Sequence, residues 1–222
     1  MTKEVLKLNI ITISYDSISE LTKTIKSIDS QRIKPNKHII VSKKLKYSQL
    51  KKFKNKYRHF ILGKDKSLYN AMNVGKKNSV NRAVLFLNGG DFFINKDAIS
   101  DILKFKKELY ENKILIFKTV LMNDNDFFYP KKSYFEKKNY FPHSSFIFFN
   151  SKSKVNIDFN EKMIISSDGK WMREIVRESV SIKKINKNLV CQVLDGQSSI
   201  PKLKTVYYRF NENFFSGVKE II

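Results

Sequence analysis

Residues 83–91 read A-V-L-F-L-N-G-G-D, an apolar run that stops at an Asn-Gly-Gly-Asp turn. A short run of consecutive apolar residues, without polar alternation, is typical of a strand that is covered on both faces of its sheet. The adjacent glycines end the run, because glycine adopts backbone conformations that other residues rarely reach. The stretch therefore predicts a buried strand with polar residues just beyond its carboxyl end.

The same pattern recurs through the first 120 residues, where short apolar runs alternate with segments of helical periodicity. Ser17 followed by Glu20 has the spacing of a capping box, which predicts the start of a helix. Alternating strands and helices are typical of a mostly parallel sheet with helices on both faces. We expect strands at 5–13, 38–41, 60–62, 83–87 and 114–120, and helices over 17–28, 45–57, 68–80 and 99–109.

The second half of the chain is less regular. Residues 127–141 are aromatic and basic, and a strand is expected at 144–149. A helix is expected at 168–176, followed by one or two strands over 182–194. No stretch rich in Pro, Gly or Ser separates the two halves, so the sequence predicts one α/β domain with a small irregular C-terminal portion.

The net charge is +22, from 43 Lys and Arg against 21 Asp and Glu. Such a charge attracts polyanions, which include nucleic acid, an anionic membrane surface and phosphorylated small molecules. Residues 34–66 are rich in Lys and contain a single acid, Asp65. A second basic cluster at 131–138 is interleaved with aromatic rings, as suits a membrane interface. A coding bias toward Lys explains the excess equally well, so charge alone selects no partner.

Several classes of protein are excluded. A single cysteine, Cys191, rules out a disulfide framework and a Cys-based zinc site. There is no glycine-rich dinucleotide fingerprint, no phosphate-binding P-loop motif and no nucleic-acid-binding signature. No apolar run approaches the roughly 20 residues that span a bilayer, and the N-terminus lacks a signal peptide. We expect a cytoplasmic protein in which His38 and His59, which border predicted strands, are structural.

Three stretches together resemble glycosyltransferase family 2: N-I-I-T-I-S-Y-D at 9–16, D-K-S-L-Y-N-A-M-N at 65–73 and L-F-L-N-G-G-D-F-F at 85–93. The resemblance covers roughly 8–200, and its specific part is 65–93. It implies the GT-A fold and inverting transfer from a nucleotide-sugar, as in bacterial enzymes of surface polysaccharide, O-antigen (lipopolysaccharide) or capsule synthesis. It also implies one transferase domain over 1–222. The implied parts are a nucleotide-sugar-binding half at 1–120, an acceptor and catalytic half at 121–200 and a basic-aromatic tail at 201–222.

The resemblance also assigns roles to individual residues. Asp91 is expected to hold Mn²⁺ or Mg²⁺, Asp168 to act as the catalytic base, and His143 to contact the diphosphate or the acceptor. Contacts to the donor are expected from Ser14, Tyr15, Asp16, Asp65, Tyr69, Asn73, Asn88, Gly89 and Gly90. Each main role has a structural alternative: Asp91 as a turn residue, Asp168 as a helix-start residue and His143 as a structural histidine whose hydrogen bonds are satisfied.

The chemistry of such a transfer suits these residue types. A divalent ion bound through hard oxygen ligands stabilises the negative charge that grows on a diphosphate leaving group. Inversion at the anomeric carbon requires a single base, which takes the proton of the acceptor hydroxyl on the opposite face of the sugar. One carboxylate for the ion and one for the proton are therefore sufficient.

Two departures from the family pattern bear on function. The chain reads V-S-K-K-L-K at 41–46, where the family usually carries an acidic segment, and Gly90 stands where the metal motif usually has its first Asp. A degenerate transferase that binds without turnover is therefore one alternative, and a basic nucleic-acid-binding α/β module, supported only by charge, is another. The preferred reading is transfer from a UDP-sugar to a lipid-linked glycan, with no nucleic acid, by a protein that is peripheral on the inner face of the membrane.

Overall fold

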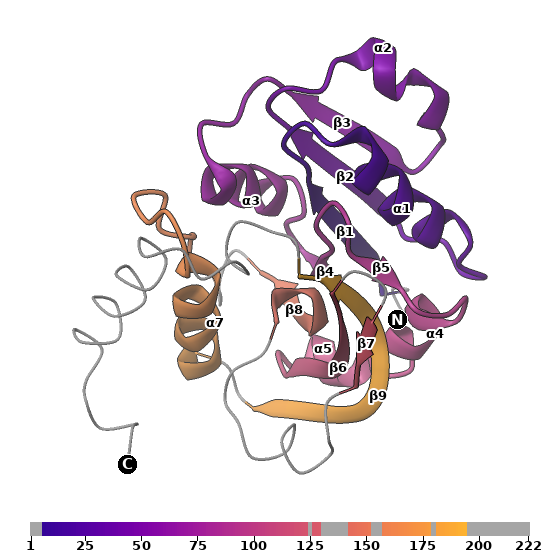
Figure 1. Ribbon diagram of the computed structural model, residues 1–222. Helices are drawn as coiled ribbons and strands as arrows, with labels where there is room; N and C mark the ends of the chain where they lie inside the picture. Colours follow the sequence, from indigo (N-terminus) through magenta and orange to yellow (C-terminus); the bar gives the residue numbers. More distant parts are fainter. Residues whose placement is uncertain (1–5, 124–125, 130–141, 152–156, 179–180, 195–222) are drawn as a thin grey trace.

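A curled sheet lies between two layers of helices in the computed structural model of this chain (Figure 1). The structure describes residues 6–123, 126–129, 142–151, 157–178 and 181–194. The basic cluster at 131–138 and the tail at 201–222 lie outside the described residues. What was expected of those two segments stays a prediction.

The strands and helices follow the expected alternation through the first half of the chain. In chain order they are β1 (Leu8–Ile13), α1 (Ile18–Asp29), β2 (Lys37–Ser42), α2 (Tyr47–Leu50), β3 (Arg58–Leu62), α3 (Leu68–Lys77), β4 (Arg82–Phe86), β5 (Phe92–Phe93), α4 (Ala98–Leu103), α5 (Lys106–Tyr110), β6 (Ile114–Asn123), β7 (Asp126–Phe128), β8 (Phe146–Asn150), α7 (Ser167–Glu178) and β9 (Ile182–Val193). Short 3-10 helices cover Lys51–Phe53 and His143–Ser145.

The strand order in the sheet is β3-β2-β1-β4-β8-β6-β9-β5, and β7 pairs with β6. The strands β3, β2, β1 and β4 are all parallel, as the sequence predicted. Beyond β4 the sheet is mixed: β8 is antiparallel to both β4 and β6, whereas β6 and β9 are parallel. The parallel half is therefore the part of the sheet whose loops gather at one edge.

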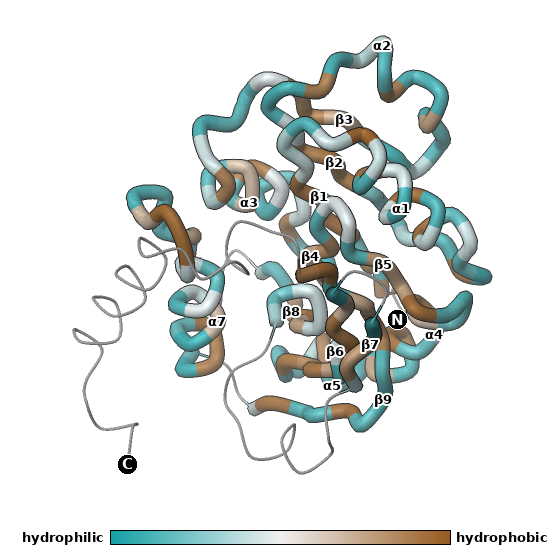
Figure 2. Tube along the Cα trace, in the orientation of Figure 1, coloured by the Kyte–Doolittle hydropathy of each residue, from teal (hydrophilic) through white to brown (hydrophobic). Residues whose placement is uncertain are grey.

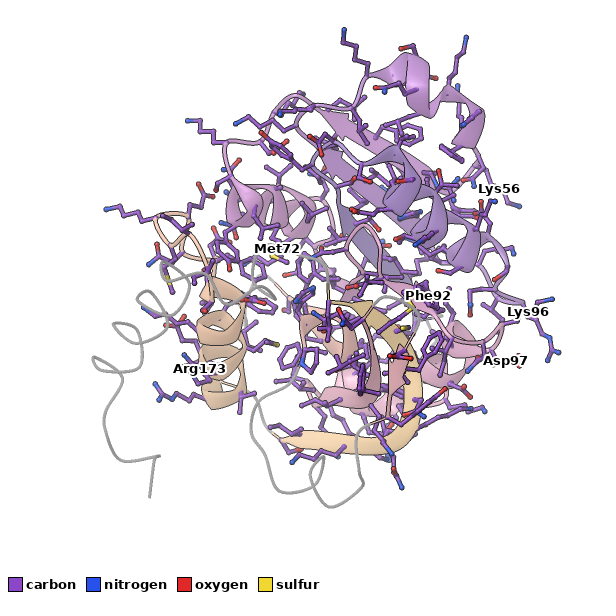
Figure 3. All side chains as sticks on the ribbon, in the orientation of Figure 1. Lys56, Met72, Phe92, Lys96, Asp97 and Arg173 are labelled. Carbon is purple, nitrogen blue, oxygen red and sulfur yellow. The ribbon has the colours of Figure 1, made fainter. Side chains whose placement is uncertain are left out.

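Both faces of the sheet are covered. Ile11 and Ile13 of β1 pack in one cluster with buried residues of α3 and α7, among them Met72, which points from α3 toward the sheet (Figure 3). Leu8 and Ile10 of the same strand pack on the other face with residues of α1, α4 and α5. Figure 2 shows that the strands at the centre are mostly hydrophobic along their length. Continuous apolar strands are the expected consequence of two covered faces.

Two helix predictions need correction. The expected basic helix over 45–57 is wrong: only α2 is α-helical there, and the 3-10 turn at Lys51–Phe53 follows it. The run is rich in exposed Lys and has no acid to pair with them, so little apolar surface and no i,i+4 ion pair sustains a longer helix. The helix expected over 99–109 is divided into α4 and α5, with Phe105 between them against Phe117 of β6.

Candidate active site

The loops that follow the parallel strands meet at one edge of the sheet. The Ser14 N–H, just after β1, donates to the Val41 carbonyl of β2 at 3.1 Å. The Gly89 N–H, after β4, donates to the Ile13 carbonyl of β1 at 2.9 Å. Asp16, Asp65 and Asp91 follow the carboxyl ends of β1, β3 and β4, so all three lie along this edge. Ligands of open α/β sheets bind at such edges.

The turn at 88–91 is fixed by the helix beside it. Gly90 has φ +98°, a conformation that glycine adopts without strain. Its N–H donates to the Thr24 hydroxyl of α1 at 3.0 Å, and that hydroxyl lies 2.7 Å from the Asp91 carbonyl. The Asp91 side chain is buried, and its Oδ1 accepts the Val193 N–H of β9 at 3.1 Å. The turn thus holds the Asp91 carboxylate in a defined place.

Asp168 lies in the first turn of α7, and the core fixes that turn. Trp171, one turn further on, is 1% exposed and stacks on Phe159 with ring centroids 4.3 Å apart. Its indole N–H donates to the Ile157 carbonyl at 2.8 Å. Because a buried aromatic ring holds the start of the helix, the position of Asp168 follows from core packing.

Three other segments bring polar side chains to the neighbourhood of Asp168, and two of these side chains contact it directly. The His143 Nδ1, from the 3-10 turn before β8, lies 3.2 Å from Asp168 Oδ2. The His143 Nε2 lies 3.0 Å from the amide nitrogen of Asn88, which follows β4. The Tyr69 hydroxyl of α3 lies 3.4 Å from Asp168 Oδ1. The structure therefore unites in one cluster four residues that the sequence singled out separately.

The charges in this cluster reinforce one another. Burial alone would raise the pKa of Asp168, but the hydrogen bond and charge of His143, with N–H groups of the helix start, hold this pKa below its ordinary value. Burial alone would lower the pKa of His143, but the hydrogen bond and charge of Asp168, with the charge of Asp91, raise it above its ordinary value. The environment thus favours an imidazolium–carboxylate pair.

Tyr15, Asp16 and Asp65 lie further along the same edge, with two lysines of the 41–46 segment, to which the sequence assigned no contact. Tyr15 is 54% exposed, and the Lys44 ammonium lies 4.4 Å from its ring centroid and 3.8 Å from Asp16 Oδ2. Asp65 is 9% exposed, and its buried Oδ1 has no hydrogen-bond partner among the described residues. Burial raises the pKa of Asp65, and the charge of Lys43 partly offsets this.

Asn73 makes contacts that the sequence did not predict. Its side chain is buried, donates to the Phe159 carbonyl at 3.0 Å and accepts the Phe159 N–H at 2.8 Å. It also donates to Glu161 at 2.8 Å, and Asn70 donates to the other oxygen of the same carboxylate at 2.9 Å. These contacts tie α3 to the segment that leads into α7. They are structural, and the expected donor contact of Asn73 stays a prediction.

Ser14 and Gly89 also contribute to the packing of the edge. Ser14 is buried, and a Cβ added to Gly89 would lie 3.3 Å from its hydroxyl oxygen. The two loops therefore approach one another closely, and a side chain at 89 would force them to shift.

No helix within the described ranges is long and apolar enough to cross a bilayer.

No protein-family model and no curated protein sequence matches this chain. Among solved structures it is similar to S. aureus TarS, with TM-score 0.66 and 16% identity over 85% of this chain and 37% of that one. TarS 1–349 in complex with UDP-GlcNAc gives TM-score 0.69 and 16% identity over 85% and 58% of the two chains. TarS 1–349 in complex with UDP gives 0.67 and 14% over 97% and 74%.

This chain thus spans between 37% and 60% of the length of the first three TarS chains it matches. TarS is a GT-A-type glycosyltransferase. At such low identities the likeness concerns the fold rather than the substrates. The chain therefore has the GT-A-like fold that the resemblance to glycosyltransferase family 2 implied.

Proposed function

We propose that this chain is an inverting glycosyltransferase that moves a sugar from a nucleotide-sugar to a glycan acceptor. The observation that carries the proposal is the cluster of Asp168, His143, Asn88 and Tyr69 beside the Asp91 turn, at the carboxyl edge of a GT-A-like sheet. The edge carries one carboxylate in the Asp91 turn and a second at Asp168. That is the minimum an inverting transfer needs.

The donor would bind along the ends of β1, β3 and β4. Asp65 Oδ1 is buried without a partner in the described part of the chain, so it would gain a hydrogen bond from a nucleobase N–H or a ribose hydroxyl. Lys43 and Lys44 occupy the place of the acidic family segment and would face an anionic donor. TarS binds UDP-GlcNAc and UDP in crystals, which supports a UDP-sugar as the donor.

Asp91 would hold Mn²⁺ or Mg²⁺. Within the described ranges no group of three His, Cys, Asp or Glu side chains is arranged to hold an ion. These ions are commonly bound through one or two carboxylates with substrate phosphates completing the shell, so a single fixed carboxylate fits a site that the donor diphosphate completes. When bound, the ion would neutralise charge that develops on the departing nucleoside diphosphate.

Asp168 would act as the base. Its side chain is 25% exposed, so an acceptor hydroxyl can reach it, while one of its oxygens is held by His143. The acceptor oxygen forms the new bond to the anomeric carbon as the bond from that carbon to the phosphate oxygen breaks. The hydroxyl proton passes to Asp168, and the electron pair of the broken bond leaves with the nucleoside diphosphate. A single displacement of this kind inverts the configuration.

The acceptor and the location are proposed from charge. A lipid-linked glycan on the inner leaflet would suit a cationic protein, because each Lys or Arg near an anionic surface contributes about 1 kcal/mol. Exposed lysines follow α2, and one of them, Lys56, lies on the outer rim of the molecule (Figure 3). Surface polysaccharide, lipopolysaccharide or capsule synthesis is the corresponding pathway. Co-sedimentation with anionic and neutral vesicles at low and high salt tests this part separately, and equal binding to both lipids contradicts it.

The function itself is tested by a screen of nucleotide-sugars with and without Mn²⁺, in which nucleotide release and donor-dependent thermal shift are measured together. We expect both signals for one donor, and both should depend on the metal. A thermal shift without release would identify a degenerate transferase. Salt-sensitive binding of single-stranded nucleic acid, with no response to any donor, would favour the nucleic-acid-binding alternative instead.

A further inference from the structure

The His143 imidazole joins two segments that are far apart in the sequence. Its Nδ1 faces Asp168 Oδ2 at 3.2 Å, and its Nε2 faces the Asn88 amide at 3.0 Å. Asn88 belongs to the turn that carries Asp91, and Asp168 belongs to the first turn of α7. We propose that His143 is a positioning residue, which fixes the Asp168 carboxylate relative to the Asn88–Asp91 turn. This inference rests on the transferase function proposed above.

Hydrogen-bond chemistry defines what each ring nitrogen does. An ionised carboxylate only accepts, so Nδ1 must carry a hydrogen and donate it to Asp168. On the other side, a neutral ring accepts from the Asn88 amide nitrogen, and a charged ring donates to the amide oxygen once the amide is turned over. The Asn88 Oδ1 is buried and has no partner within the described segments, so it is available for that second arrangement. The bond to Asp168 therefore persists in both protonation states.

The carboxylate needs such a partner. The Tyr69 hydroxyl lies 3.4 Å from Oδ1, a long contact that holds the group weakly. The contact of His143 with Oδ2, at 3.2 Å, is shorter than the 3.4 Å contact of Tyr69 with Oδ1. His143 also carries the favourable charge, and its side chain is only 12% exposed. The charged groups that face the ring are Asp168 from α7 and Asp91 from the β4 turn. With His143 in place, Oδ2 of Asp168 is anchored while a quarter of the side chain, 25%, stays exposed.

Two near-isosteric substitutions separate the two bonds of the ring. In His143→Asn the amide nitrogen occupies the place of Nδ1, so the bond to Asp168 is kept and the bond to Asn88 is lost. In His143→Gln the amide nitrogen occupies the place of Nε2, so the bond to Asn88 is kept and the bond to Asp168 is lost. We expect His143→Gln to lower kcat by about ten- to a hundredfold, as is typical when a partner that orients a functional group is removed. We expect KM for the donor to change little, and His143→Asn to keep most of kcat.

The pH profile distinguishes positioning from a merely structural role. The acid limb of kcat/KM reports the pKa of the base in the free enzyme. Because His143 lowers the pKa of Asp168, its loss in His143→Gln should move this limb to higher pH, and His143→Asn should move it less. Unchanged kcat and an unchanged acid limb in His143→Gln would overturn the proposal.

A second measurement does not depend on turnover. The His143 ring is titrated by NMR in the wild type and in Asp168→Asn, without donor, and the pKa of His143 should fall in the variant. The buried His38 is the internal control and should not respond. An unchanged His143 titration would overturn the proposal even if transfer is observed. If no nucleotide-sugar is turned over, the transferase function falls, whereas this titration still decides whether His143 holds the carboxylate.

Discussion

His38 is fully buried and the His143 side chain is only 12% exposed, yet the two rings lie beside groups of opposite charge. The His38 ring lies inside the sheet, where its Nδ1 accepts the Arg58 Nε–H at 3.1 Å and its Nε2 lies 2.9 Å from the Thr12 hydroxyl. The Thr12 hydroxyl donates its own hydrogen to the Leu87 carbonyl at 2.7 Å, so its oxygen accepts a hydrogen bond from His38. The directions of these hydrogen bonds require a neutral His38 ring with its hydrogen on Nε2.

Burial, and then the charge of Arg58, lower the pKa of His38 well below its ordinary value of 6.5. Burial also lowers the pKa of His143, but the hydrogen bond and charge of Asp168, with the charge of Asp91, raise it above the same value. Burial lowers the pKa of both rings, so the difference between them comes from the neighbouring charges: Arg58 favours a neutral His38 in the framework, whereas the carboxylates beside His143 favour its charged form at the edge of the sheet. The substitutions below replace one of the two histidines or a residue that contacts or charges it.

The largest effect on transfer is expected when Asp168, the partner of His143, is replaced. Asp168→Asn should keep donor binding and lower transfer by about 10²- to 10⁴-fold, because the amide is nearly isosteric but cannot take the acceptor proton. Single-turnover transfer and donor-dependent thermal shift measure the two properties. Glu174→Gln, a partly exposed change two turns further along α7, is the matched control and should stay close to wild type. A loss below about tenfold would move the base to another carboxylate, with Glu161 next in order and then Asp195, which lies outside the described residues.

The second largest effect concerns the other carboxylate near His143. Asp91→Ala should abolish Mn²⁺-dependent donor binding and transfer, since the change removes the one carboxylate of the turn. It should also lower the pKa of His143, because the negative charge of Asp91 contributes to the raised value. Titration calorimetry of the donor with and without Mn²⁺ measures the first effect. Asp97→Ala, on the nearby rim, serves as control, and wild-type turnover in Asp91→Ala would make Asp91 a turn residue only.

A moderate effect on stability is expected when His38 loses its hydrogen-bond partner Thr12. Thr12→Val leaves both the His38 Nε2–H and the Leu87 carbonyl without their partner, which costs about 1–3 kcal/mol of unfolding free energy. Urea denaturation measures the change. Thr22→Val is a fair control, because the Thr22 hydroxyl donates to the Ile18 carbonyl within α1 at a partly exposed position, and the change should alter stability by at most about 0.5 kcal/mol. Equal losses in the two variants would contradict the buried network.

The smallest effects lie in the pH dependence of stability, where the two histidines act in different windows. The folded pKa of His38 is lowered, so its contribution is complete above pH 6.5 and is lost as pH falls below that value. The folded pKa of His143 is raised, so its contribution is complete below pH 6.5 and is lost as pH rises through the folded value. Each group changes the unfolding free energy by at most about 1.4 kcal/mol per pH unit.

Variants separate these two windows. His38→Gln should flatten the loss of stability on the acid side of pH 6.5, and His143→Gln should flatten the loss on the alkaline side. Chemical denaturation at a series of pH values gives both slopes. If the two variants flatten the same side, the opposite charging of the two histidines is wrong.

The parallel half of the fold could be predicted from the sequence because its signals are local. Apolar runs of strand length predict β1 to β4. The predicted start of α1 is confirmed, because the Glu20 N–H donates to the Ser17 hydroxyl at 3.3 Å. The insertion of β8 between β4 and β6 could not be predicted, because no local pattern reveals which strands become neighbours. The same holds for β9, whose pairing with β6 shifts register around Lys118.

The site divides in a similar way. Motif spacing drew attention to Asp91, His143 and Asp168, but it could not show that the ring of His143 and the hydroxyl of Tyr69 both point at Asp168, since these contacts join residues distant in sequence. It could not show that the Asn73 amide pairs with the Phe159 backbone, and the donor contact expected of Asn73 stays a prediction. Residue types are read from the chain, whereas their mutual geometry depends on long-range packing.

The place of β8 in the sheet has a consequence for synthesis of the protein on the ribosome. β4 is complete once residue 86 has emerged, and β1 can pair with one of its edges at once. Its other edge, where Ala83 pairs with Phe149 and Val84 with Phe148, must wait some sixty residues for its partner. Until then a nascent chain would expose the unpaired edge of a mostly apolar strand, the kind of surface that promotes pairing between chains. Slow translation between β4 and β8, or release of a chain truncated before β8, should therefore favour aggregation or chaperone capture.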